Sequence, residues 1–244
     1  MAKSKKWMWI VFTIVVVVFG TCIVYFVMLH GLREFFYPKS PHLPKAVDRP
    51  LEDILRDLDG VLIEKAPFVA IQLQPGLHPR KINELEKKAG IELTDELRAL
   101  YIWHNGCSTE SNQNFIPGHL FLPLDTIIEQ YMICKQQLKS ASIPQRIAFN
   151  VFAGHRKDWI TIFDDLCGDG YFYDPNRKNN EGCIFYHLAE GGYYFFFPSL
   201  KNLLTAITEC YIQDAYSQVS GSNTLKQNYE HSEKIFAKFG AECK

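Results

Sequence analysis

Four aspartates lie close together in the stretch DDLCGDGYFYD, namely Asp164, Asp165, Asp169 and Asp174. Carboxylates at this density could bind a calcium ion or carry protons in a hydrolytic reaction. Their spacing does not match the Asp-x-Asp-x-Asp-Gly loop with a terminal Glu that calcium-binding loops use. The sequence therefore predicts a hairpin that turns at Asp169-Gly170 with acidic flanks. As a function for these four residues we predict an acidic rim that attracts a basic protein partner.

A second candidate contact site is the run Trp103-His104-Asn105-Gly106. Its ring and amide side chains could form a polar corner that a partner recognises. Asn-Gly is also a common left-handed end of a helix, and a tryptophan beside it often packs inside the domain. The contact role of Trp103, His104 and Asn105 is thus one of two interpretations that the sequence leaves open.

The remaining reactive residues do not form a recognisable catalytic pattern. Cys107 has no neighbour in the sequence that would activate its thiol, and Ser108 lies outside any Gly-x-Ser-x-Gly turn. Phosphate-binding loops and the zinc motif HExxH are absent from the sequence. We therefore expect no enzymatic activity, no cofactor and no metal, and keep a hydrolase that uses the acidic loop as a remote alternative. Scattered histidines that could serve as bases are His104, His119, His155 and His187.

The N-terminal segment predicts a membrane anchor. Residues 7–29 contain no charged side chain, and 23 residues at about 1.5 Å each would span a hydrocarbon core of roughly 30 Å. A cleaved signal peptide would have a shorter apolar stretch followed by small residues. A lipoprotein site at Cys22 also fits poorly, since Phe19 lies three residues before it. We predict a single-pass membrane protein.

The side of the membrane that carries the folded domain stays open. Lysines before the span favour a cytoplasmic N-terminus and a domain on the far side, although basic residues also follow the span. The cysteines beyond the span form no CxxC pair and no zinc-finger spacing, which favours a reducing compartment. These two signals disagree.

Charge and composition limit the partners of the folded part. The chain has 244 residues with 26 Lys plus Arg and 27 Asp plus Glu, and 47% of its residues are hydrophobic. All three charges of residues 1–29 are lysines, so the rest carries 23 positive and 27 negative charges, a net of −4. No polybasic surface is expected, and we exclude nucleic acid as a partner.

The hydrophobic pattern predicts an α+β domain with a largely antiparallel sheet and packed helices. Helices are expected over 51–59, 79–89, 94–104, from 125, from 200 and over 226–239; strands over 68–73, 146–152, 159–163, 171–173, 183–188 and 193–197. The chain divides into a basic N-terminus (1–6), the span (7–29), a proline-rich tether (30–50), the domain (51–216), and a linker with a helical tail (217–244).

The stretch LQPGLHPRKINELEKKAGIELTDELRALYIWHNG, residues 73–106, resembles the opening of the SUKH superfamily. The shared features are Leu73-x-Pro75-Gly76, Ile82 with Glu86, a turn from Gly90 to Leu93, and a helix that ends in an aromatic residue and Asn105-Gly106. Thr94 stands where the family usually has proline. Later segments at 120–128, 159–176 and 198–207 are similar in order, so the resemblance covers roughly residues 60–213.

The resemblance implies a protein-binding module of the Smi/Knr type. Bacterial members of the superfamily are immunity proteins that occlude a toxin, and a yeast member regulates cell-wall assembly through protein partners. For this chain we expect a membrane-anchored, non-enzymatic domain that neutralises a cognate toxin. The alternative is a regulator or scaffold of cell-wall or envelope synthesis, because a shared fold does not fix the partner.

Overall fold

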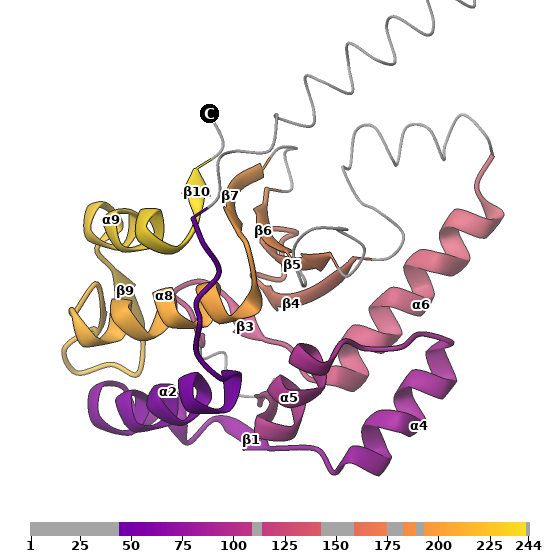
Figure 1. Ribbon diagram of the computed structural model, residues 1–244, viewed down its shortest axis with the longest axis horizontal. Coiled ribbons are helices and arrows are strands. Elements are labelled where there is room, and N and C mark those ends of the chain that lie inside the picture. The colour runs from indigo at the N-terminus through magenta and orange to yellow at the C-terminus, as the bar shows by residue number, and fades with distance from the viewer. Residues whose placement is uncertain (1–43, 109–113, 143–158, 175–182, 189–192, 243–244) are drawn as a thin grey trace, which may run out of the picture. The chain divides into compact units, whose positions relative to one another are not determined.

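A computed structural model describes residues 44–108, 114–142, 159–174, 183–188 and 193–242. Within these ranges helices and antiparallel strands combine in one α+β unit (Figure 1), as the sequence predicts. Among the described residues, no helix has both the length and the apolar character needed to cross a bilayer. The predicted span at 7–29 lies outside the described residues.

The first elements differ in part from the prediction. Helix α2 covers Leu51–Lys65, six residues longer than expected, and buries one apolar face that includes Leu58 and Leu62. The strand predicted at 68–73 is wrong. Pro67 instead begins the one-turn helix α3 (Pro67–Ala70), and the strand β1 follows at Leu73–Pro75. Proline suits the first turn of a helix because its missing N–H would have no helical partner there.

Helices α4 (Pro79–Ala89) and α5 (Asp95–Trp103) begin and end at the local signals in the sequence. Gly90 ends α4 in the left-handed conformation with φ of 64°, and the Thr94 hydroxyl accepts the Leu97 N–H at the start of α5. The predicted Asn-Gly end of α5 is wrong, because α5 passes directly into the strand β2 (His104–Cys107). Strand β2 pairs antiparallel with β1.

A six-stranded antiparallel sheet forms the second half of the domain, in the order β10-β7-β6-β5-β4-β3. Its register places Asp164 opposite both Leu120 and Gly170. The strand predicted at 146–152 lies outside the described residues. The strands are β3 (Leu120–Phe121), β4 (Ile160–Asp164), β5 (Gly170–Asp174), β6 (Cys183–His187), β7 (Tyr193–Phe197) and β10 (Ala241–Glu242).

Two long helices flank the sheet. Helix α6 (Leu124–Ser140) begins after Pro123 and contacts β4, while α8 (Leu200–Ile212) contacts β6 and β7 and lies beside α2 (Figure 1). The Ser199 hydroxyl accepts the Asn202 N–H and caps α8, as predicted.

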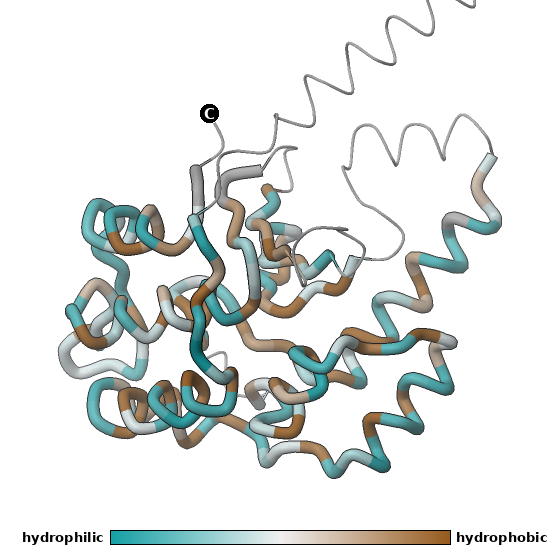
Figure 2. Tube along the Cα trace, viewed as in Figure 1, coloured by the Kyte–Doolittle hydropathy of each residue, from teal (hydrophilic) through white to brown (hydrophobic). Residues whose placement is uncertain are grey.

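The C-terminal part is neither a linker nor a loose helix. Strands β8 (Tyr216–Gln218) and β9 (Leu225–Gln227) form a hairpin that spans the linker predicted at 217–223, and β9 overlaps the start of the helix predicted at 226–239. Helix α9 (Tyr229–Phe239) packs on α8 and buries Ile235 and Phe236 in the core. Most apolar residues of α2, α8 and α9 are buried in the core, and Figure 2 shows hydrophobic positions along each of these helices.

Buried Asn202 connects three distant segments. Its Oδ1 accepts the Val47 N–H at 3.0 Å, and its Nδ2 donates to the carbonyls of Lys45 at 3.3 Å and Phe239 at 2.9 Å. A buried amide with all these bonds fixes its neighbours, because any lost partner would leave a polar group unsatisfied. The segment before α2 and the end of α9 are therefore both attached to α8.

Candidate partner-binding site

The polar atoms of the corner residues Trp103, His104 and Asn105 bind other parts of the domain. Trp103 Nε1 donates to Asp59 Oδ2 at 2.8 Å, and the Asn105 Oδ1 accepts the Leu124 N–H at 2.9 Å. His104 Nδ1 lies 2.9 Å from the Gln74 carbonyl oxygen, and its Nε2 lies 3.2 Å from Asp59 Oδ1. These bonds join α2, β1, α5 and the start of α6, which supports a structural role for the corner.

Asp59 is a residue of this corner that the sequence does not reveal. It lies on α2, 44 positions from Trp103, and its two carboxylate oxygens contact Trp103 and His104 separately. The sequence shows it only as an acidic residue within a helix. A contact over this separation follows from the packing of α2 on α5, so no local pattern could have indicated it.

Three of the four predicted aspartates meet at the turn between β4 and β5. Asp165 Oδ1 accepts the N–H groups of Cys167 at 2.7 Å and Asp169 at 2.9 Å, and Asp164 Oδ1 accepts that of Leu166 at 2.5 Å. Leu166 adopts a φ of 65° and exposes 64% of its surface. We name residues 164–169 the acidic turn. The carboxylates of Asp164 and Asp165 thus fix the backbone of the acidic turn by accepting its N–H groups.

Asp174 does not join the acidic turn. It ends β5, four residues after Gly170, where it is buried and opposite Cys183. At about 3.3 Å per residue the length of β5 separates it from the turn by roughly 13 Å. The structure thus divides the predicted cluster of four into three residues at one end of the strand and one at the other.

His119 and two tyrosines lie against the acidic turn, and the sequence does not indicate this contact. The His119 ring lies 5.4 Å from that of Tyr171 and 5.3 Å from that of Tyr186, both edge-on. The Tyr186 hydroxyl forms a hydrogen bond with Asp169. Burial raises the pKa of Tyr186, and the negative charges of Asp169 and Asp165 add to this. Tyr186 therefore stays a neutral hydrogen-bond donor to the turn.

His119 is buried and its Nδ1 lies 3.1 Å from the Pro117 carbonyl oxygen. Because a carbonyl only accepts, Nδ1 carries the proton in the neutral ring, and among the described residues Nε2 has no hydrogen-bond partner. Burial lowers the pKa of His119, although the Pro117 carbonyl and the charges of Asp164, Asp165 and Asp169 act in the opposite direction. Burial has the larger effect because it removes water from the charged ring.

This lowered pKa predicts that His119 destabilises the fold in acid. The unfolded chain binds the proton near pH 6.5, and the folded chain binds it only at lower pH. Stability from neutral His119 is therefore present above pH 6.5 and decreases as the pH falls. Thermal unfolding at several pH values should show a smaller loss below pH 6.5 for His119→Phe than for the wild type. The control His231→Phe should keep the wild-type dependence, and an unchanged slope in His119→Phe would contradict the prediction.

A pocket of about 200 Å³ opens beside the acidic turn, between α6 and the strands β4 and β5. Asp164 and Gly168 of the acidic turn line it. Burial raises the pKa of Asp164, while its bond with the Leu166 N–H lowers it. The other residues that line the pocket are uncharged, and they are Ile127, Gln130, Tyr131, Cys134, Trp159, Ile160, Thr161 and Phe172. Asp164 is thus the one charged group among the described residues of this pocket.

The model of the SMI1 / KNR4 family (SUKH-1) matches residues 76–206, more than half of the chain. The chain belongs to this family. No curated protein matches it.

The SUKH-1 match contains both candidate contact sites. It extends from Gly76, directly after β1, into α8, and it includes the corner and the acidic turn. Helices α2 and α9 lie outside the matched residues. The resemblance that the sequence indicated is therefore confirmed, and α2 is packed against a helix that is partly inside the match.

Three of the five described cysteines are buried in the domain. Five described cysteines are free thiols, and Cys107, Cys183 and Cys210 are buried. Burial raises the pKa of Cys107 to about 11, although a backbone bond with Phe121 lowers it slightly. Such a thiol is protonated at neutral pH and is a poor nucleophile. Within the described ranges, no three His, Cys, Asp or Glu side chains are placed to hold a metal ion.

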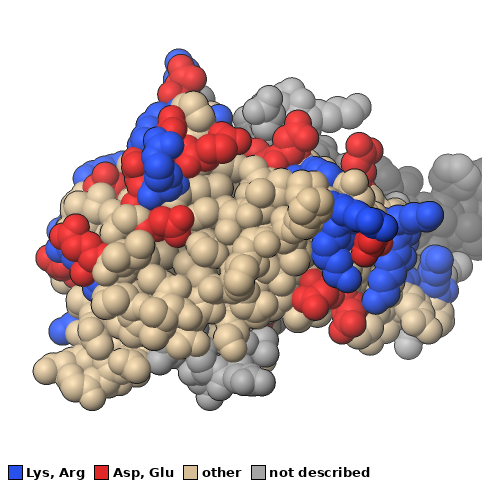
Figure 3. Space-filling model, turned by 90° about the horizontal axis from the view of Figure 1, so that it is seen from below, with Lys and Arg blue, Asp and Glu red and all other residues tan. Residues whose placement is uncertain are grey.

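A surface without charged side chains covers much of the side of the molecule seen from below (Figure 3). Helices α2, α4 and α5 lie on this side in Figure 1. The exposed isoleucines of these elements are Ile63 on α2 and Ile102 on α5, and Ile71 follows α3. Charged groups border the uncharged area on more than one side. It is a second surface on which a protein could pack.

Proposed function

We propose that this chain is a membrane-anchored, non-enzymatic SUKH domain that binds and neutralises a toxin. Membership of the SUKH-1 family supports a binding role, since domains of this family are generally non-enzymatic immunity or regulator domains. The protonated state of Cys107 agrees with that role because it gives no thiolate nucleophile.

The observation that carries the proposal is the charge of the acidic turn. Among the described residues, neither Asp164 nor Asp165 forms an ion pair with Lys, Arg or His. Their backbone bonds hold the carboxylates in place beside the pocket at α6. Fixed negative charge on an exposed turn accelerates association with a basic protein. We therefore expect the toxin to present lysines or arginines to this turn.

The predicted span at 7–29 would keep the domain at the membrane. A tethered binding domain encounters a partner at the membrane at a much higher local concentration than a free one. This part of the proposal depends on the apolar sequence of residues 7–29. It can be tested by fractionation of cells that express the full chain.

The test of the proposal uses a toxin encoded next to this gene. Cells that express the toxin should grow when the full chain is co-expressed. The double variant Asp165→Asn and Asp169→Asn should slow association with the purified toxin by about tenfold at low salt. Asparagine keeps an oxygen that can accept the same N–H groups, so the turn should keep its shape.

A matched control removes two negative charges elsewhere, by Glu52→Gln with Glu92→Gln, both at exposed positions. This variant should associate at the wild-type rate. Equal effects of the two double variants would reject the acidic turn as the contact site. Failure of the wild type to protect cells would reject toxin immunity itself.

The alternative is a regulator or scaffold of cell-wall or envelope synthesis, a role that is also known in this family. Wall-synthesis genes beside this gene, in place of a toxin gene, would favour it. Deletion of the gene should then change wall composition or sensitivity to wall-active compounds. Under the immunity proposal, deletion should matter only when the toxin is present.

A further inference from the structure

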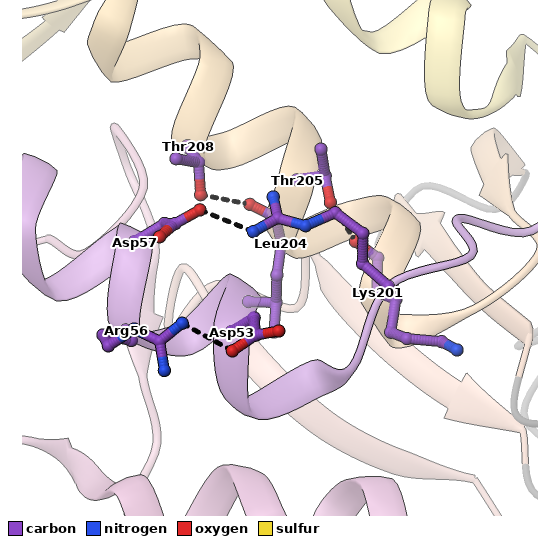
Figure 4. Close-up of polar contacts among 8 residues, drawn as sticks. Asp53, Arg56, Asp57, Lys201, Leu204, Thr205 and Thr208 are labelled. Carbon is purple, nitrogen blue, oxygen red and sulfur yellow. Dashed lines mark hydrogen bonds and ion pairs between the residues drawn. The ribbon is translucent and has the colours of Figure 1, made fainter.

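Helices α2 and α8 lie side by side and leave a groove of about 470 Å³ between them. Figure 4 shows the polar groups here: Asp57 and the Arg56–Asp53 pair belong to α2, while Thr205 and Thr208 belong to α8. Both threonine hydroxyls donate to carbonyls of their own helix, to Lys201 at 2.7 Å and Leu204 at 2.7 Å. Small side chains with satisfied hydroxyls leave room for another helix to approach.

Gly60 lies in the middle of α2 and lines this groove. A Cβ atom added there would meet no atom within 4 Å, and its backbone is helical. Alanine would therefore fit, and glycine is the less stable choice inside a helix. The fold does not need Gly60. A close approach by another backbone is a use of glycine that would explain it.

Two charges of opposite sign, Arg56 and Glu64, lie at equal distances from Gly60 on α2. Arg56 lies four residues before it and Glu64 four residues after it, and all three line the groove. Positions four apart share one face of a helix. Arg49 pairs with Asp57 and so lies near Arg56, and the bond from Lys65 to Asp214 brings the ends of α2 and α8 together, which places Glu209 nearer Glu64. Asp57 also lines the groove and pairs with Arg49, so Arg56 is the lining cation left for a partner at that end, whereas the other end carries Glu64 and Glu209.

We propose that the α2–α8 groove binds a second copy of this chain, with α2 of the two copies antiparallel and crossing at Gly60. A two-fold axis at Gly60 places Arg56 of each copy beside Glu64 of the other. A two-fold interface must be complementary to itself, and this charge order meets that condition. Arg56 exposes 71% of its side chain, so its guanidinium is accessible despite its bond to Asp53.

The charge order also selects among possible occupants. Arg49 pairs with Asp57 at 2.7 Å and Arg56 with Asp53 at 2.5 Å, whereas no ion pair of the described residues includes Glu64 or Glu209. The end with Glu64 and Glu209 therefore lacks a cation, and the exposed Arg56 of a second copy would supply one. An unrelated helix would not require the symmetric spacing of Arg56, Gly60 and Glu64.

Charge reversal tests this arrangement. The full chain, purified in a mild detergent, should sediment as a dimer, and Arg56→Glu or Glu64→Arg should each weaken the dimer at least tenfold. The variant with both changes should recover dimerisation, because the two-fold axis pairs the exchanged charges again. A monomeric wild type at its highest soluble concentration would overturn the proposal. Recovery would not follow from a purely structural role of either residue.

Changes at Gly60 provide an independent test. A cysteine on a two-fold axis lies beside the same cysteine of the other chain. Gly60→Cys should therefore form a disulfide-linked dimer on mild oxidation. Lys87→Cys on α4 is the control and should remain unlinked. Gly60→Leu should fold as stably as the wild type, since the groove has room, but should lose the dimer. A dimeric Gly60→Leu, or equal crosslinking of the two cysteine variants, would overturn the crossing at Gly60.

Discussion

Replacing Gly76 by alanine is expected to unfold most of the domain. Gly76 follows β1 and lies directly against the end of α5, where an added Cβ atom would overlap the carbonyl oxygen of Ile102. The adjacent Leu77 N–H donates to the Tyr101 carbonyl at 2.8 Å, so the backbone cannot move away without losing a bond. We expect a loss of at least about 4 kcal/mol, which few single changes reach. Thermal unfolding followed by circular dichroism measures it.

Two other glycines are controls for this prediction. Gly90 has a φ of 64° but open space around it, so Gly90→Ala should cost only the backbone strain of about 1 kcal/mol. Gly60→Ala should stabilise the fold by about 0.5–1 kcal/mol, since Gly60 is helical and unobstructed. The three variants separate a steric overlap from a φ effect and from helix propensity. A Gly76→Ala protein as stable as Gly90→Ala would refute the overlap.

The helix boundaries were predictable where the chain carries its own signal. Thr94 and Ser199 cap α5 and α8 with their hydroxyls, and Gly90 ends α4 in the left-handed region, all within a few residues of the element concerned. Residues 68–73 carry a short apolar run, and such a run fits either a strand or a buried turn of helix. Pro67, which begins α3, was the available local signal.

The candidate sites were predictable only in part, because contacts across the chain complete them. The sequence shows the aspartates of the acidic turn but not His119 and Tyr186, which reach it through the sheet and the loop before β3. In the same way, Asp59 joins Trp103 only because α2 packs against α5. Asp174 does not join the acidic turn because it lies at the opposite end of β5. Local spacing predicts a turn, whereas strand length and packing decide its neighbours.

The hairpin β8–β9 shows that composition alone does not distinguish a linker from a folded turn. The run from Ser217 to Asn223 is rich in small polar residues and was predicted as a linker. Gly221 instead turns the chain with a φ of 73°, and the Val219 N–H donates to the Thr224 carbonyl at 2.8 Å. Buried Tyr216 and Leu225 attach the hairpin to the core. Turn residues and linker residues are the same types, so burial of the flanking residues decides between them.

Glu86→Ala is expected to have the second largest effect on stability. Glu86 lies on the buried side of α4, and its Oε1 accepts the Leu93 N–H at 2.8 Å while its Oε2 pairs with Arg98 of α5. Alanine would leave the buried Leu93 N–H without its acceptor and would deprive the largely buried Arg98 guanidinium of its carboxylate, although its bond to Asn83 would remain. Loss of one member of such a pair costs about 3 kcal/mol. At 2–4 °C for each kcal/mol, the melting temperature should fall by roughly 6–12 °C.

The matched variant Glu86→Gln separates the hydrogen bond from the charge. The glutamine amide oxygen can still accept the Leu93 N–H, but the substitution removes the negative charge that Arg98 faces. We expect it to lose about 1 kcal/mol, the scale of one weakened hydrogen bond. Arg98 also donates to Asn83 Oδ1 at 2.5 Å, which would keep the guanidinium in position. If alanine and glutamine cost the same, the Leu93 bond contributes nothing, and the junction of α4 and α5 depends on the ion pair alone.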